Sequence, residues 1–289
     1  PAATTWNFAT GADYSAGKYG AASDTTVFSL PFAARAQTGR FRLDLTIPYL
    51  WEKGPGDFAG GGVVVPNGTV TSRSGVGDVN LGAAWQLHPD DSSFPAFEIQ
   101  GNLKVPTAGT GLGTGKFDYG LQANINHTFG RVMLFGSLGY QWMHDFRGYD
   151  LRNGVAASVG ANFRIGDTVN AGLTANYRQP YYAPLGEQVS SSPYLLWSFA
   201  PKWRVSTDLL PAFSKAMRHI GSSGVPSSGT SRNASWSIPN VTMPPPAGSS
   251  RPLVASNRPP SPTSITQASA GLRANARNVA AVVISKKLG

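Results

Sequence analysis

Charged and amide side chains in this chain recur at every second residue of otherwise apolar segments, a spacing that places them together on one face of an extended strand. Arg42 and Asp44 are spaced in this way, as are Gln122 and Asn124. Such side chains can pair with one another or line a polar path for a solute. The candidate lumen-lining residues are Asp13, Arg35, Arg42, Asp44, Asp78, Glu98, Lys104, Asp118, Gln122, Asn124, Arg164, Arg178, Arg204 and Asp208.

The charged members of this set are six acids and six bases. A balanced set lacks the single-sign field that selects ions strongly. Mutual ion pairing and contact with a solute therefore explain any one residue equally well, and only the set as a whole indicates a polar pathway.

Enzymatic and metal chemistry find little support in the sequence. An outer-membrane phospholipase would place a histidine and a serine two residues apart on one strand face, and none of His88, His127 and His144 has a serine at that offset. Four isolated histidines and no cysteine offer no ligand pair at strand or helix spacing. We therefore expect no catalysis, no cofactor and no metal. The alternating glycines of 109–115 fit neither a P-loop nor a dinucleotide fingerprint, and they predict a flexible external loop.

Strands must position these residues. In 117–129, Tyr119 and Leu121 fall on one face and Gln122 and Asn124 on the other, which is the repeating unit of a transmembrane β-barrel. The same two-residue period recurs in eleven segments: 5–15, 25–36, 40–51, 76–87, 97–105, 117–129, 132–142, 155–165, 169–177, 194–199 and 203–210.

The connections between these segments alternate between short and long, and the longest, 52–75, is a candidate lid. This rhythm predicts an antiparallel up-and-down barrel with short periplasmic turns, long external loops and a periplasmic N-terminus. A soluble β-sandwich would explain the alternation but not the rhythm. Aromatic residues near the segment ends predict two interfacial girdles: Trp6, Tyr49, Trp51, Trp85, Tyr140, Trp142, Tyr181, Tyr182, Trp197 and Trp203.

Two prolines lie inside predicted strands, Pro31 and Pro48. Proline cannot donate to a ladder, and a closed barrel has no free edge to place it on. We therefore expect a bulge at each proline.

The composition agrees with a membrane barrel. Charged residues make up 13% of the chain, against about 25% in an average globular protein. No apolar run reaches the length of a transmembrane helix, about 18 residues. The Pro-Ala-Ala start fits a mature terminus left after processing of an exported precursor.

Several motifs, in order and spacing, resemble those of outer-membrane transporters often labelled meta-pathway phenol-degradation proteins. They are Ser-Gly-Val-Gly-Asp at 74–78, Val-Pro-Thr at 105–107, Gly-Leu-Gly-Thr-Gly at 111–115 with Asp118-Tyr119, Phe-Gly-Arg at 129–131 and Gly-Tyr-Asp at 148–150. The resemblance covers about residues 6–213. It implies a barrel of about twelve strands that passes small solutes, including aromatic or hydrophobic compounds. Such barrels end on a strand with a terminal aromatic residue, whereas this chain ends in Lys-Lys-Leu-Gly.

Residues 214–289 have a different composition from the rest. They contain no acidic residue and account for the whole net charge of +9. Rich in Ser, Pro, Ala and Arg, this tail is expected to be largely disordered. A frameshift near Phe213 would explain the missing twelfth strand, and a genuine basic extension is the other explanation. Residues 278–285 offer a substitute closing strand, which on our reading would turn Ala280, Val282 and Ile284 toward the lumen.

The sequence thus favours an outer-membrane channel for passive transport of small solutes. The alternatives are a non-conducting structural or adhesive barrel and a soluble β-rich binding protein. The expected partners are outer-membrane lipids, lipopolysaccharide, the barrel assembly machinery and a small-molecule solute, with no nucleic acid.

Overall fold

The computed structural model describes residues 3–17, 23–58, 64–87, 94–145, 150–181, 187–208, 213–217 and 282–288. Within these ranges the chain forms fourteen strands, which confirms the all-β prediction. No helix in the described part of the chain is long and apolar enough to cross a membrane. The strands are β1 (Thr4–Gly17), β2 (Thr25–Thr38), β3 (Phe41–Phe58), β4 (Val64–Val76), β5 (Val79–Leu87), β6 (Ala96–Val105), β7 (Asp118–Phe129), β8 (Val132–Trp142), β9 (Gly154–Arg164), β10 (Val169–Arg178), β11 (Glu187–Ala200), β12 (Trp203–Asp208), β13 (Phe213–Met217) and β14 (Val282–Leu288).

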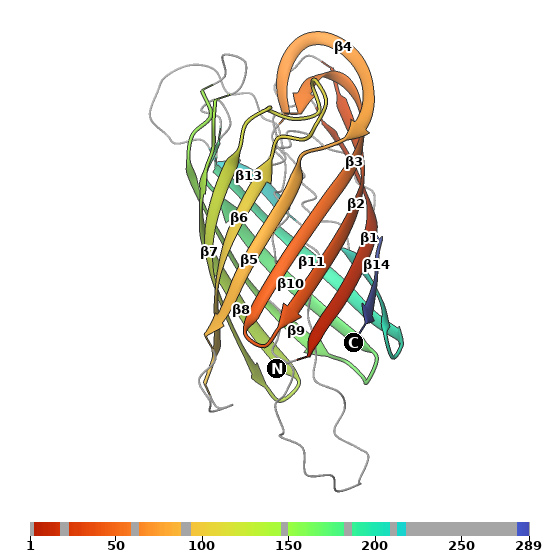
Figure 1. The fold of residues 1–289 in the computed structure, drawn as a ribbon, viewed down its shortest axis with the longest axis vertical. Coiled ribbons are helices and arrows are strands. Elements are labelled where there is room, and N and C mark those ends of the chain that lie inside the picture. Colours follow the sequence, from red (N-terminus) through yellow and green to blue (C-terminus); the bar gives the residue numbers. More distant parts are fainter. Residues whose placement is uncertain are drawn as a thin grey trace, which may run out of the picture.

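The strands close into one antiparallel barrel (Figure 1). Around the ring the order is β10-β9-β8-β7-β6-β5-β3-β2-β1-β14-β12-β11, and β11 pairs back with β10. β4 pairs with β3 beyond β5, and β13 pairs with β11 beyond β12, so neither takes a place of its own in the ring. Of the fourteen described strands, twelve therefore form the wall. The predicted up-and-down barrel of about twelve strands is confirmed.

The twelfth strand comes from the tail. β14 pairs with β1 from Trp6 to Ala12 and with β12 from Trp203 to Thr207, so it fills the gap between them. The predicted substitute strand is right in kind, but it runs from Val282 to Leu288 rather than over 278–285.

The register of β14 corrects the face that we expected for it. Ile284 stands opposite Thr10, which belongs to the same alternate set of β1 as the exposed Trp6 and Phe8. Directly opposed residues of an antiparallel pair share a face, so the position of Ile284 is on the outer side. Ala280 and the rest of 218–281 lie outside the described residues, and disorder and a frameshift remain predictions.

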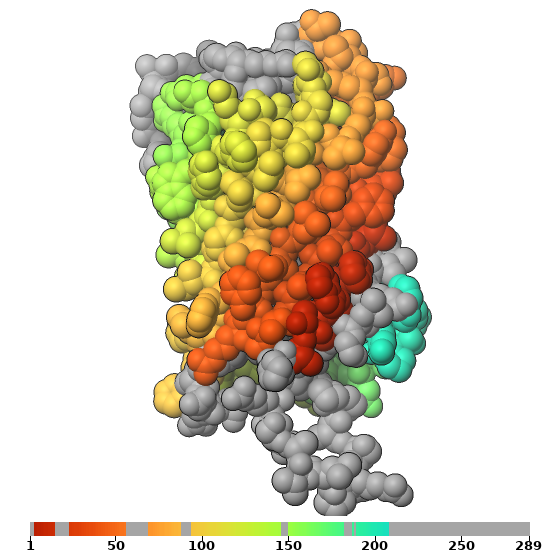
Figure 2. Space-filling model, viewed as in Figure 1, coloured from red at the N-terminus to blue at the C-terminus, as the bar shows by residue number. Residues whose placement is uncertain are grey.

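Apolar residues face outward and polar residues inward along the wall. In β7, 51% of Leu121 is exposed, whereas Asn124 is only 5% exposed. Figure 2 shows the outer side chains of β3, β5, β6 and β7 packed side by side over one face of the barrel. This distribution is the reverse of that in a water-soluble protein, and it matches the faces predicted for 117–129.

The long connection predicted at 52–75, the candidate lid, is largely a hairpin of β3 and β4. β3 extends to Phe58 and pairs with β4, with a register shift between Gly54 and Gly56. Gly54 has a φ of 149°, and a Cβ atom there would come within 2.4 Å of the Thr25 backbone. Gly54, which helped to hide the strand pattern, is thus required by the close approach of β2.

The predicted bulge is found at Pro48 but not at Pro31. Pro31 and Pro48 stand opposite one another in the β2–β3 ladder without a register shift. On the far side of β3 the register shifts by one residue between β4 and β5, where the Gly77 N–H donates to the Pro48 carbonyl at 2.8 Å. Between β1 and β2 the pairing omits Pro31 and keeps its register. A missing N–H costs a ladder bond there but inserts no extra residue.

The ends of the barrel differ as expected. Short turns at one end carry Gly39 and Gly130 with φ near 60°, and the N-terminal end of β1 lies at that end (Figure 1). Exposed aromatic residues mark both ends, among them Trp6 and Trp85 near the short turns and Trp51 and Trp142 near the long connections.

Tyr181 was wrongly placed in a girdle, because it is only 6% exposed and lies beside Arg178. Tyr182 is outside the described residues. β11 begins at Glu187, before the predicted 194, since its small residues Ser190–Ser192 show no apolar alternation.

Candidate functional site

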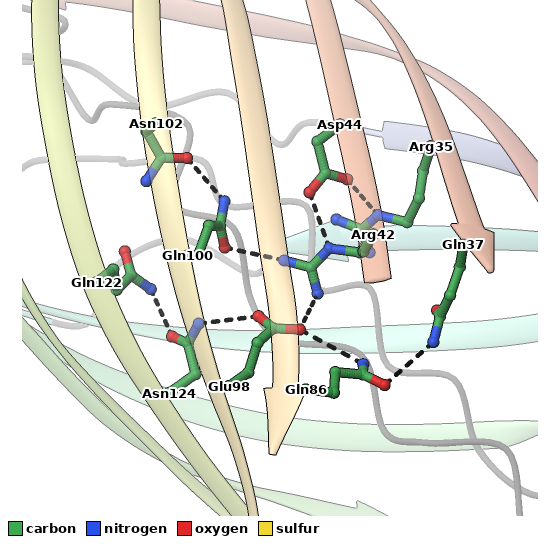
Figure 3. Close-up of polar contacts among 10 residues, drawn as sticks. All are labelled: Arg35, Gln37, Arg42, Asp44, Gln86, Glu98, Gln100, Asn102, Gln122 and Asn124. Atoms are coloured by element: carbon green, nitrogen blue, oxygen red, sulfur yellow. Dashed lines mark hydrogen bonds and ion pairs between the residues drawn. The ribbon is translucent and has the colours of Figure 1, made fainter. Parts of the chain in front are cut away.

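The inner faces of β2, β3, β5, β6 and β7 carry a connected lattice of charged and amide side chains (Figure 3). They occupy alternate positions of neighbouring strands, so they project from the wall to the same side. The lattice consists of Arg35, Gln37, Arg42, Asp44, Gln86, Glu98, Gln100, Asn102, Gln122 and Asn124.

Arg42 is the centre of this lattice and is fully buried. Its Nε donates to Asp44 Oδ2 at 2.8 Å, its Nη1 to Glu98 Oε2 at 2.5 Å and its Nη2 to Gln100 Oε1 at 2.9 Å. The guanidinium thus ties its own strand to β6, and β5 lies between those two strands. A planar fork of donors suits this multidentate role better than an ammonium would.

Asp44 also accepts a hydrogen bond from the Nε of Arg35 on β2. Its carboxylate therefore bridges two guanidinium groups. With Glu98, the lattice holds two cations and two anions and has no net charge. Pairing of this kind is what permits charges to stay buried, because an unpaired buried charge is very costly.

Amide side chains extend the lattice along β6 and β7. Gln100 donates to Asn102 at 2.7 Å, and Gln122 donates to Asn124 at 2.6 Å. Asn124 donates in turn to Glu98 Oε1 at 3.1 Å. These bonds fix the side chains to one another, so the wall presents an ordered polar surface.

A second charged cluster lies at the end of the barrel that carries the long connections. Lys104 Nζ is 2.6 Å from Asp118 Oδ2 and 3.2 Å from Asp78 Oδ2, and it donates to Thr114 Oγ1 at 2.6 Å. All four side chains are buried. Asp118 Oδ1 also accepts the backbone N–H of His144 at 3.0 Å, which connects the cluster to the β8–β9 connection.

Two further pairs surround this end of the barrel. The Arg73 Nε on β4 lies 3.6 Å from Glu52 Oε2 on β3. On the other side, the Arg178 guanidinium carbon sits 5.0 Å from the centre of the Tyr181 ring. Burial raises the pKa of the Tyr181 hydroxyl, while Arg178 acts in the opposite direction. Tyr181 therefore stays neutral and offers Arg178 its ring face.

The wall formed by β8 to β11 has a different chemistry. Gly160 and Gly172 leave room for two rings: an added Cβ would come within 2.2 Å of Phe135 at Gly160 and of Tyr194 at Gly172. The rings therefore lie directly on the glycine backbone. The Tyr194 hydroxyl donates to the buried Asn162 Oδ1 at 3.2 Å.

A small apolar cluster accompanies these rings. Phe135 and Met133 of β8 pack with Leu196 of β11, and all three are buried. Hydroxyl groups border it, since Ser137 and Ser158 share a hydrogen bond of 2.6 Å. In the ring order β9 and β10 stand across from β2 and β3, so this surface faces the wall that carries Arg42.

The structure brings seven predicted residues into the two charged clusters, and Gln122 and Asn124 join the amide extension. Of the others, Arg178 is buried beside Tyr181, while Asp13, Arg164 and Arg204 are half-buried on the polar sets of β1, β9 and β12. Asp208 ends β12, and its side chain is outside the described part. The clustered residues are Arg35, Arg42, Asp44, Asp78, Glu98, Lys104 and Asp118.

The prediction missed several residues of the interior. Gln86 and Gln100 follow the two-residue period and could have been added to the set. Phe135 and Tyr194 were missed because an aromatic ring on a barrel strand is expected to face lipid. The signal that marks them as inward is the glycine paired with each, Gly160 with Phe135 and Gly172 with Tyr194. Residues 109–115 lie in the β6–β7 connection, and residues 111–114 are buried against the Lys104 cluster rather than solvated as a flexible loop would be; that this connection is external stays a prediction.

Comparisons with known proteins bear on the fold. No family model matches the chain, and no curated protein matches it. The crystal structure of an outer membrane channel from Pseudomonas putida F1 matches with a TM-score of 0.55 and 13% identity, over 99% of this chain and 96% of that one. The chain therefore has the fold of an outer-membrane channel barrel.

Other solved structures are more distant. The CymD monoaromatic hydrocarbon channel matches with a TM-score of 0.41 and 14% identity, over 73% of this chain and 84% of that one. A FadL homologue from Pseudomonas aeruginosa matches with a TM-score of 0.37 and 11% identity, over 98% of this chain and 88% of that one.

Proposed function

We propose that the protein is an outer-membrane channel for passive transport of small solutes, with no catalytic step and no cofactor. One observation carries the proposal: a closed ring of strands has an apolar and aromatic outer surface and a charged, amide-rich inner surface. Only a bilayer gives the outer surface a favourable environment, and only water or a polar solute suits the inner one. A soluble binding protein would need the opposite arrangement.

The chemistry of the two inner walls supports small solutes that combine an apolar ring with a polar group. The Arg42 lattice offers fixed hydrogen-bonding groups. The facing wall offers the rings of Phe135 and Tyr194 beside hydroxyl and amide groups. Aromatic compounds that carry hydroxyl or carboxyl groups fit both walls, which agrees with the solute class that the sequence resemblance implies.

Size limits the solute further. Eight-stranded barrels are filled by their side chains, and those of 16 to 18 strands hold an open aqueous channel. Twelve strands with long inward side chains such as Arg42 and Lys104 leave a narrow passage. We therefore propose single small molecules as solutes rather than oligosaccharides or peptides.

A non-conducting structural barrel is the second candidate, and the completeness of the ion pairing favours it. Arg42, Asp44 and Glu98 satisfy one another, as ion-paired plugs do. Single-channel recording of the refolded full chain in planar bilayers separates the two candidates. Discrete conductance steps support the channel. A chain that folds, as heat-modifiable gel mobility shows, but gives no steps supports the structural barrel.

For the orientation, we propose short turns in the periplasm and long connections outside, with lipid and lipopolysaccharide around the wall and insertion by the barrel assembly machinery. The absence of cysteine makes a clean test possible. Lys116→Cys, on a long connection, should react with a membrane-impermeant maleimide on intact cells, whereas Lys202→Cys, in a short turn, should react only after lysis. The reverse pattern would refute this orientation.

A further inference from the structure

The connection between β6 and β7 folds back onto the inner face of the barrel. We call residues 106–114 the mouth segment. Residues 111–114 within it are buried, and the side chains they meet, Lys104 and Asp78, belong to the inward polar set. An external loop that only joined two strands would be solvated along its length. This one packs on the inner side of β4, β5 and β6 at the end of the barrel with the long connections.

The first half of the mouth segment is fixed to the strand ends by local hydrogen bonds. Thr107 Oγ1 accepts the Val79 N–H at 2.9 Å and donates to the Gly77 carbonyl at 3.0 Å. The Ala108 N–H donates to Asp78 Oδ1 at 3.1 Å. These bonds determine where the segment leaves the wall and that it turns inward.

The second half is held by charge. Thr114 Oγ1 accepts a hydrogen bond from Lys104 Nζ at 2.6 Å, and the same ammonium group is paired with Asp78 and Asp118. Lys104 therefore links the far part of the mouth segment to carboxylates on both sides of β6. Without the ammonium charge, Asp78 and Asp118 would be two close buried carboxylates that have lost the cation they share.

The alternating glycines of the mouth segment are explained by this packing. At Gly111, φ is 85° and a Cβ atom would come within 2.0 Å of Arg73 Nη1. At Gly113 it would come within 2.6 Å of Asp78 Oδ1. Leu112 reaches the hairpin as well, since its Cδ1 would be 3.2 Å from a Cβ at Gly75. The segment thus bridges from the Lys104 cluster to β4.

From this arrangement we propose that the mouth segment forms the size-determining constriction of the channel and that Lys104 is the residue that positions it. The inference rests on the proposed channel function, but the position of the segment can be measured without any conductance. Lys104 acts through Thr114 and the two carboxylates, and it need not touch the solute.

The first test follows the segment itself. In a chain without other cysteines, Leu112→Cys should react slowly with an impermeant maleimide in the folded barrel. Adding Lys104→Met should raise the labelling rate by about tenfold, because a buried thiol reacts through locally opened states. Lys116→Met, which removes an exposed ammonium two residues beyond the segment, is the matched control and should leave the rate unchanged. Equal rates in all three chains would overturn the positioning role of Lys104.

The second test follows passage. Lys104→Met should raise the single-channel conductance by about twofold, as expected for a widened constriction, and should admit larger sugars in liposome swelling. If Lys104→Met made the thiol of Leu112→Cys reactive and still left the conductance and the size cut-off for sugars at their wild-type values, the segment would move without limiting passage. This result would overturn the constriction. If no folded chain, wild type included, gave any conductance steps, the proposed channel function itself would be refuted.

Thr114→Val provides a second variant in case Lys104→Met does not fold. It removes the hydroxyl that Lys104 holds and keeps the three charges of the cluster paired. Labelling at position 112 and conductance should both rise, by less than in Lys104→Met. No rise in either, in a barrel of normal heat-modifiable mobility, would overturn the inference.

Discussion

Arg42 Nη1 on β3 and Glu98 Oε2 on β6 are 2.5 Å apart, and both side chains are buried inside the barrel. Strand β5 lies between their strands, so the two side chains meet over it. The pair is therefore a crosslink within the wall as well as part of its inner surface.

Arg42→Met should destabilise the folded barrel by about 3 to 5 kcal/mol, because it leaves Glu98 buried without its cation and takes from Asp44 one of its two guanidinium partners. Glu98→Gln in the same chain should recover part of that loss. Urea unfolding in lipid vesicles measures both variants, and a double-mutant cycle gives the coupling free energy. Additive effects of the two substitutions would contradict a direct interaction.

Arg42 should also affect passage if the lattice borders the solute path. A change in single-channel conductance is expected for Arg42→Met and, separately, for Arg178→Met at the other end of the barrel. The outward residue Leu138 provides the control, since Leu138→Met alters only the outer surface. Conductance that stays the same in both arginine variants would argue against a role of these residues in the passage.

The two faces of β7 should differ in their tolerance of charge. Leu121→Arg places a charge on the outer face and should cost about 2 to 4 kcal/mol if the residue lies near the bilayer midplane. Gln122→Arg turns inward and should be tolerated much better. Unfolding in vesicles compares the adjacent positions, and equal costs would undo the assignment of the faces.

Gly172→Ala should destabilise the barrel by about 1 to 3 kcal/mol, the usual cost of overpacking, because its Cβ would lie within 2.2 Å of the Tyr194 ring. Adding Tyr194→Ala removes the obstruction, so the glycine substitution should then cost little. Gly101→Ala on β6 is the control, since no atom lies within 4 Å of its added Cβ. If Gly172→Ala cost as much unfolding free energy in the Tyr194→Ala background as in the wild type, the Tyr194 ring would not be the group that lies against Gly172.

Closure by β14 predicts that its backbone donors are essential. Ile284 is paired with Thr10 on one side and Val205 on the other. Ile284→Pro removes an N–H from the ladder, and the barrel should lose its heat-modifiable gel mobility. Ile284→Val keeps the donor and should retain that mobility. Normal mobility of the proline variant would mean that another segment closes the ring.

Most of the barrel could be predicted because apolar and polar residues alternate within each strand, so the sequence of a single strand assigns its outer and inner faces. Leu121 and Gln122 need no knowledge of their neighbours to be assigned. The extension of β3 past Trp51 was missed because Gly54 and Gly56 interrupt the alternation, and Gly54 is required there by the approach of Thr25 from β2. Local patterns cannot show a contact that is made only in the fold.

The candidate site likewise has a part that could be predicted from residue spacing and a part that depends on how the strands pair. That Arg42 and Glu98 face inward follows from their spacing, but that they meet depends on the stagger of three strands. The inward position of Tyr181, and the closure by β14 after the long Ser/Pro/Arg-rich stretch, likewise depend on tertiary pairing. Sequence patterns indicated which residues are polar and inward, and the register decided which of them touch.

The predicted lumen-lining charges balance in number, yet those that the structure describes are separated across the width of the barrel. The described inward side chains of β1 to β7 include Asp13, Asp44, Asp78, Glu98 and Asp118 and fewer bases, whereas those charged on β9, β10 and β12 are arginines. The barrel therefore has a transverse electric field, perpendicular to the direction of passage. A dipolar molecule would travel through it with one preferred orientation, its negative end toward β9 to β12. Loss of tumbling, rather than attraction of one ionic sign, would then distinguish one small solute from another.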